Sequence, residues 1–313
     1  MKKLSKANFN QAAAFVQAQA REVDKRLFDY YFGESTDRRE LADTAVPVLK
    51  ALAAYQNKDG GFGHGIEPDF RLRASSPMAT SVGLQYCVAV GATADQPVVQ
   101  KAIDYLAGTY DWEHHYWPAT YENVNEEPHA FWWHVDKLTP PDETRWPNPS
   151  AEIVGYLHRY ASLVPGDLLS QATRRAEANL NSSEIITGET PQKYNVMCWE
   201  RAAASLPGAL ATAVTTAIQR TFAAYDSIQA GTFEELSILH LAPTPNSILA
   251  QIAPDVIQQA LDDEIDNQAE DGGWWPGWHW GQYEDVWPIA KQEWAGKITV
   301  ETLHTLKNYS RIE

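Results

Sequence analysis

The stretch Gln56-Asn-Lys-Asp59-Gly60-Gly61-Phe62 returns near the other end of the chain as Gln268-Ala-Glu-Asp271-Gly272-Gly273-Trp274. Both copies read Gln-x-x-Asp-Gly-Gly-aromatic, and each follows a segment whose apolar residues recur at helical spacing. An Asp-Gly pair is typical of a helix end at which the backbone needs a positive φ. The glutamine can hydrogen-bond exposed backbone groups of neighbouring helix ends, and the aromatic ring can cover them. We therefore interpret the motif as a structural staple between helices.

A second internal similarity lies between these two copies. Pro77-x-Ala79-x-x-Val82-Gly83 is matched 72 residues later by Pro149-x-Ala151-x-x-Val154-Gly155. The two Gln-x-x-Asp-Gly-Gly copies are 212 residues apart, which is close to three such steps. Recurrence at a fixed spacing is the mark of a repeat architecture. We predict a repeated helical-pair unit that closes on itself.

Helical spacing dominates the rest of the chain. Apolar residues recur every three or four positions in 9–27, 41–55, 79–90, 98–106, 151–163, 168–180, 206–225, 256–265 and 298–309. Connections rich in proline, glycine and tryptophan separate these segments, and no convincing strand pattern occurs. The sequence therefore predicts an all-α fold of about ten to twelve helices. Because no flexible linker divides the chain, we expect one domain, residues 1–313.

The composition excludes several classes of partner. The chain has 25 Lys and Arg against 41 Asp and Glu, a formal net charge of −16. Nucleic acids and anionic membranes need a cationic surface, so we expect no nucleic-acid partner. No apolar stretch is long enough to predict a membrane span, and polar residues interrupt any signal peptide. Two isolated cysteines, Cys87 and Cys198, fit a reducing compartment, and we expect a cytoplasmic protein.

The Gln-x-x-Asp-Gly-Gly-Phe/Trp motif resembles the QW repeat of terpenoid cyclases and protein prenyltransferase β subunits. The resemblance covers 41–90 and 256–309, and it extends to the middle of the chain through 149–155. It implies an α/α toroid, in which inner and outer rings of helices surround a central cavity. A shared fold does not by itself imply an activity.

The residues that carry the standard activities of that family are missing. The chain has no Asp-x-Asp-Asp acid tetrad, and neither cysteine has an aspartate two positions before it, as the prenyltransferase zinc site requires. Asp262-Asp263-Glu264-Ile265-Asp266 matches the magnesium-binding pattern Asp-Asp-x-x-Asp. Helical geometry, with Leu261 on the packed face, predicts that these acids point to solvent instead.

The loops that follow the two staples carry the best candidates for chemistry. If the repeat holds, both loops leave the toroid at the same end. Carboxylate, histidine and arginine converging at a cavity mouth would suit acid–base or anion-binding chemistry. The same pattern would result if Arg71 and Arg73 merely paired with Glu67 and Asp69 to order a long loop. The predicted catalytic residues are Glu67, Asp69, His64, Glu284 and Asp285. The predicted ligand-binding residues are Arg71, Arg73, Trp132, Trp133, Trp275, Trp278, Trp280 and His279.

Tryptophan lies mainly in the connections of this sequence. Over a cavity, indole rings can stack on sugars or bind an apolar chain, and they can also simply plug the ends of a toroid. A further cluster, His114, His115, His129 and His134, matches no metal-binding spacing. We therefore predict no metal and no cofactor.

Three functions remain open from the sequence. The first is a toroid that binds a small or chain-like, isoprenoid-like ligand in a tryptophan-lined central cavity, with acid–base chemistry. The second is a carbohydrate-active hydrolase or lyase on an (α/α)6 barrel, which would bind a glycan and use paired carboxylates. The third is a non-catalytic binding or scaffold protein, whose cavity would be filled by its own side chains.

Overall fold

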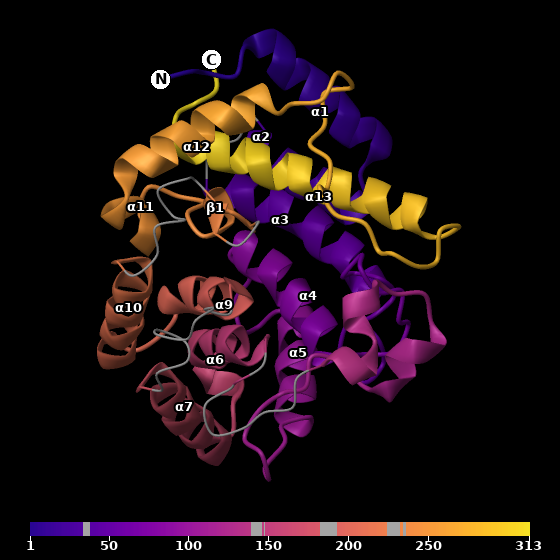
Figure 1. Cartoon of the computed structure of the whole chain (residues 1–313). Helices are drawn as coiled ribbons and strands as arrows, with labels where there is room; N and C mark the ends of the chain where they lie inside the picture. The colour runs from indigo at the N-terminus through magenta and orange to yellow at the C-terminus, as the bar shows by residue number, and fades with distance from the viewer. Residues whose placement is uncertain (34–37, 139–145, 147, 182–192, 224–231, 234–235) are drawn as a thin grey trace.

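Helices make up almost all the regular structure of the protein (Figure 1). The structure is a computed structural model that describes residues 1–33, 38–138, 146, 148–181, 193–223, 232–233 and 236–313. Its helices are α1 (Lys6–Gln19), α2 (Glu22–Phe32), α3 (Arg38–Leu52), α4 (Pro77–Ala89), α5 (Pro97–Gly108), α6 (Ser150–Arg159), α7 (Gly166–Asn181), α9 (Lys193–Ala203), α10 (Gly208–Ala223), α11 (Ile248–Ile252), α12 (Pro254–Asp266) and α13 (Trp287–Asn308). Two residues each form the antiparallel strands β1 (Thr232–Phe233) and β2 (Leu236–Ser237). The all-α class predicted from the sequence is confirmed.

The apolar pattern at 9–27, predicted as one helix, is divided between α1 and α2. Ala20 and Arg21 have extended backbones, with ψ of 159° and 155°. The break turns the Arg21 guanidinium into the interior, where it donates to the Ile66 carbonyl at 2.9 Å and to Asp24 at 2.7 Å. A buried ion pair, which the apolar spacing does not reveal, thus sets the boundary between the two helices.

Helix α13 begins eleven residues before the segment that its apolar spacing predicts. Pro288 lies in its first turn, where the missing N–H costs no helical hydrogen bond. Trp287 and Trp294 are therefore helical residues, not parts of a connection as predicted. The short helix α11 and helix α9 were not predicted either. The predicted helix at 206–225 corresponds to α10, and its last two positions lie outside the described residues.

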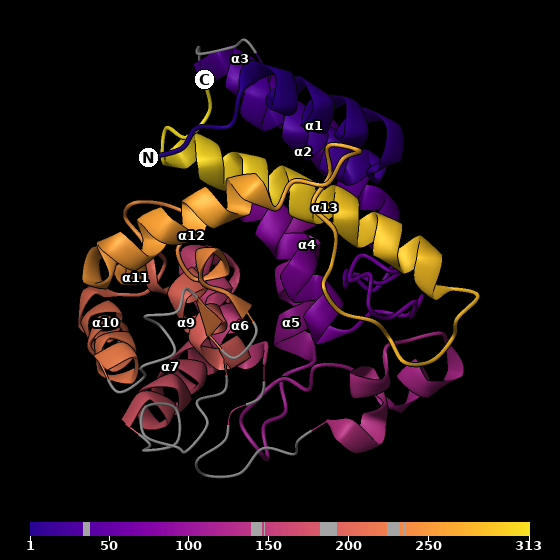
Figure 2. The same ribbon diagram turned by 45° about the horizontal axis from the view of Figure 1, so that its top comes forward.

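The helices follow a circuit around the centre of the molecule. Contacts run from α3 to α4, from α4 to α6, from α6 to α9, and onward through α10 and α11 to α12. Helix α13 then packs against α1 and α2, which returns the chain to its starting point. Figure 2 shows α4, α6, α9, α12 and α13 around this centre. The two complete concentric rings of a toroid stay a prediction.

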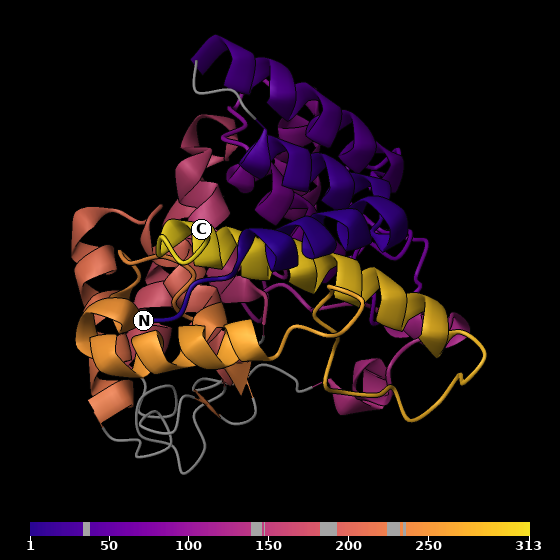
Figure 3. The same cartoon turned by 90° about the horizontal axis from the view of Figure 1, so that it is seen from above.

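A short bridge near the two ends of the chain holds the circuit closed. The Leu4 N–H donates to the Arg311 carbonyl at 2.7 Å, and the Glu313 N–H donates to the Leu4 carbonyl at 3.1 Å. The Arg311 side chain is fully buried and binds the Lys2 carbonyl and Asp262. The two ends lie near each other in Figure 3, where α1 runs beside α13.

The two Gln-x-x-Asp-Gly-Gly turns have matching geometry. The glutamine Nε2 lies 2.9 Å from the carbonyl of Gly60 in one and of Gly272 in the other. The same atom also donates to the first turn of a neighbouring helix, at 2.9 Å to Val98 in α5 and 3.0 Å to Asn8 in α1. The two glycines have φ of 93° and 92°. The interpretation of the motif as a structural staple is thus consistent with the hydrogen bonds.

One contiguous cluster of buried apolar side chains extends from Leu4 to Leu306. It draws on helices from both ends and from the middle of the chain. Among the helices that the structure describes, none combines the length and the apolar character that crossing a membrane demands.

Candidate functional site

The loops after the two staples meet, and Asp69 is the point of contact. Its Oδ1 accepts hydrogen bonds from three indole N–H groups: Trp294 at 2.7 Å, Trp280 at 2.9 Å and Trp278 at 3.4 Å. The Asp69 side chain is buried, at 7% exposed. Burial raises the pKa of its carboxyl group, and the three indole donors oppose that rise. The predicted residues Asp69, Trp278 and Trp280 are therefore brought together.

Glu67 lies beside Asp69 and is equally buried, at 8% exposed. Its Oε1 accepts the Asp69 backbone N–H at 3.4 Å. Burial, followed by the charge of Asp69, raises the pKa of Glu67 to about 8. Glu67 is therefore a protonated acid at neutral pH, whereas Asp69 has the donors that favour the ionised form.

The basic residues of the same loop pair with carboxylates elsewhere. Arg71 forms a two-pronged ion pair with Glu293 of α13. Arg73 is 78% exposed, with its Nε 3.7 Å from Glu127. His64 is exposed, has φ of 55°, and its Nε2 lies 2.9 Å from Asn57 Oδ1. Arg71 and Arg73 thus pair with Glu293 and Glu127, not with Glu67 and Asp69 as the loop-ordering alternative predicts, and the side chain of His64 contacts Asn57.

The second loop places its remaining candidates at the surface. His279 and Glu284 form an exposed ion pair at 3.2 Å, and Asp285 is exposed as well. Trp275 is 38% exposed, and its indole N–H donates to Asp271 at 3.0 Å within the staple itself. These residues do not converge with Glu67 and Asp69 into one acid–base constellation.

A third segment, 128–134, packs against both loops. The Ala130 N–H donates to the Asp69 carbonyl at 2.8 Å, and the Phe131 N–H donates to the Trp280 carbonyl at 3.2 Å. Trp132 and Trp133 are half-buried and pack against the aromatic cluster around Trp280. Indoles here fill the junction between loops, as in the plugging alternative.

The predicted histidine cluster is dispersed between two places. His114 binds Asp111 at 2.9 Å, whereas the ring of His129 lies 5.8 Å from that of His134. Within the described part of the chain, no three His, Cys, Asp or Glu side chains are grouped as metal ligands.

A central cavity of about 380 Å³ lies inside the circuit of helices. Its size falls within the range of about 300–1,000 Å³ typical of small-molecule sites. Its lining comes from α2, α4, α6, α9, α12 and α13, together with the segment 237–247. The described lining contains no tryptophan, so the predicted tryptophan-lined cavity is wrong for this cavity. None of the predicted catalytic residues lines it either.

Two ion pairs stand in the cavity wall. Arg201 of α9 lies 3.2 Å from Glu152 of α6, and Lys297 binds Glu301 one turn further along α13. Glu152 also accepts from Gln85 Nε2 at 2.9 Å and from the Tyr156 hydroxyl. Burial would raise the pKa of Glu301, but the adjacent Lys297 ammonium group holds it below its usual value.

Two further acids of the cavity, Glu200 and Glu264, have no cationic partner among the described residues. Burial raises the pKa of Glu200 to about 7. Its Oε1 accepts the Ile248 N–H at 2.8 Å, while its buried Oε2 has no partner in the described structure. Burial also raises the pKa of Glu264, whose Oε1 accepts from Thr302 at 3.2 Å.

Two histidines and a tyrosine complete the polar wall. Burial lowers the pKa of His240, and it lowers the pKa of His304 to about 4. The His304 ring is stacked on Tyr31, with ring centroids 3.6 Å apart. Both histidines are therefore neutral near pH 7 and can donate or accept hydrogen bonds.

The acidic run at 262–266 is only partly a solvated helix face. Asp263 is exposed, as predicted, but Asp262 is 24% exposed and binds the buried Arg311. Glu264 points into the central cavity, which corrects the prediction that these acids face solvent. The correction arises because α12 packs on two sides, against the ends of the chain and against the cavity.

The acids of the central cavity were not predicted as a site because they lie on four different helices. The available signal was a polar residue on the apolar face of a helix. Glu152 and Tyr156, four positions apart, form such a pair, as do Lys297 and Glu301. Two polar residues at this spacing on a single helix are equally typical of an interaction on the protein surface.

No protein-family model and no curated protein matches the sequence significantly. Among solved structures, a crystal structure of a protein from Actinoplanes is similar, with a TM-score of 0.54 and 14% sequence identity. The match covers 97% of this chain and 99% of that chain. At this identity the likeness concerns the fold alone.

Proposed function

We propose that the central cavity is the site of acid–base chemistry on a small, neutral, polyhydroxylated ligand of the glycan class. The observation that carries the proposal is the split between two carboxyl groups of one cavity. Glu200 has a pKa raised to about 7, and Glu301 has a pKa below its usual value. Groups whose environments push their pKa values apart are suited to act as acid and base.

In this scheme Glu200 protonates the leaving oxygen of the ligand, and Glu301 accepts a proton from the attacking water. The buried Oε2 of Glu200 has no hydrogen-bond partner among the described residues, so it is the carboxyl oxygen that would have to make this contact. The tyrosines and neutral histidines of the wall supply further partners for hydroxyl groups. This division of labour is that of the glycoside hydrolases, in which two carboxyl groups act on one linkage.

The charge of the cavity argues against an anionic ligand such as an isoprenoid diphosphate. Its described cations, Arg201 and Lys297, each already bind a carboxylate, and Glu200 and Glu264 are left over. A diphosphate would have to compete with those carboxylates. The volume of the cavity also argues against a scaffold whose interior is filled by its own side chains.

The test is a screen of neutral glycans and glycosides for hydrolysis, with isoprenoid diphosphates as the competing class. We expect turnover of a neutral glycoside that falls as the pH rises above about 7, because Glu200 then loses its proton. Glu200→Gln should abolish turnover, and Glu284→Gln, which removes an exposed carboxylate of the second loop, should leave it unchanged. Turnover or tight binding of a diphosphate alone would overturn the proposal, as would full activity of Glu200→Gln.

A further inference from the structure

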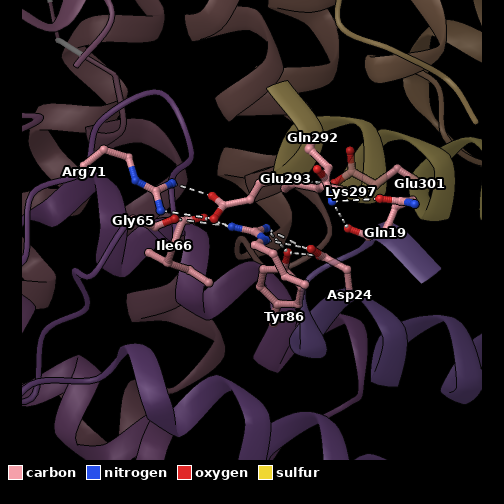
Figure 4. A network of polar contacts seen from close by, with 11 residues as sticks. Gln19, Asp24, Gly65, Ile66, Arg71, Tyr86, Gln292, Glu293, Lys297 and Glu301 are labelled. Carbon is pink, nitrogen blue, oxygen red and sulfur yellow. Dashed lines mark hydrogen bonds and ion pairs between the residues drawn. The ribbon is translucent and has the colours of Figure 1, made fainter. Parts of the chain in front are cut away.

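Neither Glu67 nor Asp69 lines the central cavity, and neither forms an ion pair with a described residue. Each nearby described cation binds another carboxylate: Arg21 binds Asp24, Arg71 binds Glu293, and Lys297 binds Glu301. Figure 4 shows the Arg71–Glu293 pair and the Lys297–Glu301 pair, together with Asp24 and Tyr86. Two adjacent buried carboxyl groups without a counter-ion are not both ionised, so one of them keeps a proton.

The hydrogen bonds decide which of the two keeps it. One carboxyl oxygen of Asp69 accepts hydrogen bonds from three indole N–H groups, and such donors stabilise the ionised form. Glu67 receives only the Asp69 backbone N–H at 3.4 Å. The proton therefore resides on Glu67.

The pair is connected to the cavity through α13. The indole N–H of Trp294 donates to Asp69 at 2.7 Å. The Lys297 ammonium group lies over the same ring, 5.8 Å from its centroid. Lys297 lines the cavity and binds Glu301. The charges of Lys297 and Arg21 both act on Glu67, so Lys297 is attracted by Glu301 and, when Glu67 is ionised, by Glu67 as well.

We propose that Glu67 and Asp69 are positioning residues for the cavity: Asp69 fixes the Trp294 ring beneath Lys297, and the proton on Glu67 keeps Lys297 on Glu301. When Glu67 loses this proton to solvent, a buried anion competes with Glu301 for the ammonium group. Glu301 is then less well paired, and its pKa rises toward the ordinary value. The inference rests on the proposed function only in assigning Glu301 the role of base.

Other charged groups around Glu67 do not relieve this competition. Just before α2, Arg21 is held by Asp24 and by two carbonyls, and the Tyr86 hydroxyl of α4 also contacts Asp24. On α13, Glu293 is held by Arg71. Lys297 is the described cation that acts electrostatically on Glu67 and also lines the cavity.

The experiment follows the side-chain carboxyl signal of Glu301 by ¹³C NMR against pH, in the full chain without any ligand. Glu301→Gln assigns the signal by its disappearance. We expect a step near pH 8 in the natural sequence, where Glu67 titrates, and no such step in Glu67→Gln, which is always neutral. Glu22→Gln, which removes an exposed carboxylate of α2, should retain the step.

A second variant tests the part played by Asp69. Trp294→Phe keeps a ring beneath Lys297 but removes the N–H that binds Asp69, and it should shift the Glu301 signal at neutral pH. A Glu301 signal that titrates identically in Glu67→Gln, or that is unchanged in Trp294→Phe, would overturn the proposal. Because the readout needs no substrate, it is independent of the hydrolase screen: a step without turnover would refute only the proposed function.

Discussion

The turns at 56–62 and 268–274 agree in their hydrogen bonds, whereas the loops that follow them differ. In both turns a backbone N–H after the glycines donates to a threonine, from Phe62 to Thr80 at 3.0 Å and from Trp274 to Thr299 at 2.9 Å. The first loop then buries two carboxyl groups, and the second provides two of the indoles that bind one of them, Asp69. The two turns thus share the contacts that join helices, whereas the two loops differ in sequence and bind each other, one through a carboxylate and the other through indoles.

The largest expected effect at a single pH concerns the glycines that both turns share. A methyl group on Gly60 would lie 2.3 Å from the Lys101 carbonyl oxygen, and on Gly272 it would lie 2.6 Å from the Gln11 backbone. Gly60→Ala and Gly272→Ala should each lower the free energy of unfolding by about 3 kcal/mol, from backbone strain and overlap together. Urea unfolding measures this loss. Gly91→Ala is the matched control, because Gly91 has φ of 68° but open space around it, and it should cost only about 1 kcal/mol.

The next effect separates the two loops by pH. Glu67 has a pKa of about 8 in the folded protein, above the value of an unfolded chain. The folded state therefore holds a proton that the unfolded state releases, and stability falls as the pH rises from about 4.5 to about 8. Relative to Glu67→Gln, the natural sequence should lose roughly 1 kcal/mol per pH unit in this window.

Urea unfolding of both proteins at several pH values gives the comparison. Asp285→Asn, in the second loop, should reproduce the pH dependence of the natural sequence because Asp285 is exposed. Parallel curves for Glu67→Gln and the natural sequence would show that Glu67 is ionised throughout.

A smaller effect ranks the indoles that join the loops. Trp280 is fully buried and donates to Asp69 at 2.9 Å, whereas Trp278 is 38% exposed and donates at 3.4 Å. Trp280→Phe should cost about 2 kcal/mol of unfolding free energy and Trp278→Phe under about 1 kcal/mol, because Trp280 gives Asp69 the shorter hydrogen bond and water cannot replace a donor at its buried position. Equal losses in the two variants would mean that the hydrogen bonds to Asp69 do not hold the loops together.

The smallest effect tests whether the two staples are energetically equivalent. Gln56→Ala and Gln268→Ala each remove two hydrogen bonds to backbone carbonyls. Each should lower the thermal midpoint by a similar amount, which corresponds to about 1 kcal/mol. If one variant lowered the thermal midpoint much more than the other, the two turns would be alike in geometry but not in their contribution to stability.

The sequence predicted those parts of the fold that local patterns encode. The period of apolar residues located most of the helices, and the glycines at 60 and 272 marked turns that need a positive φ. The break at Arg21 was missed because it depends on Asp24 and on carbonyls of a distant loop. Local spacing carries no information about such a long-range partner.

The candidate site was predicted only in part, for the same reason. Asp69, Trp278 and Trp280 were singled out because tryptophans and acids are concentrated in two repeat-related loops, whereas Trp294, the third donor, lies within α13 and was not predicted as a site residue. The cavity acids Glu152, Glu200, Glu264 and Glu301 lie on separate helices and converge only when the circuit closes. Their chemistry belongs to the tertiary structure and leaves no motif in the sequence.

Closure of the circuit also bears on how the chain folds during synthesis. Helix α1 and the staple at 268–274 are partners, yet the ribosome makes them far apart in time. At about 5–20 residues per second, α1 waits roughly fifteen seconds to a minute before α13 is complete. During that interval its apolar face, including Phe15 and Val16, has no α13 to cover it. Chaperone capture of nascent chains should therefore begin early and end only when the last helix emerges.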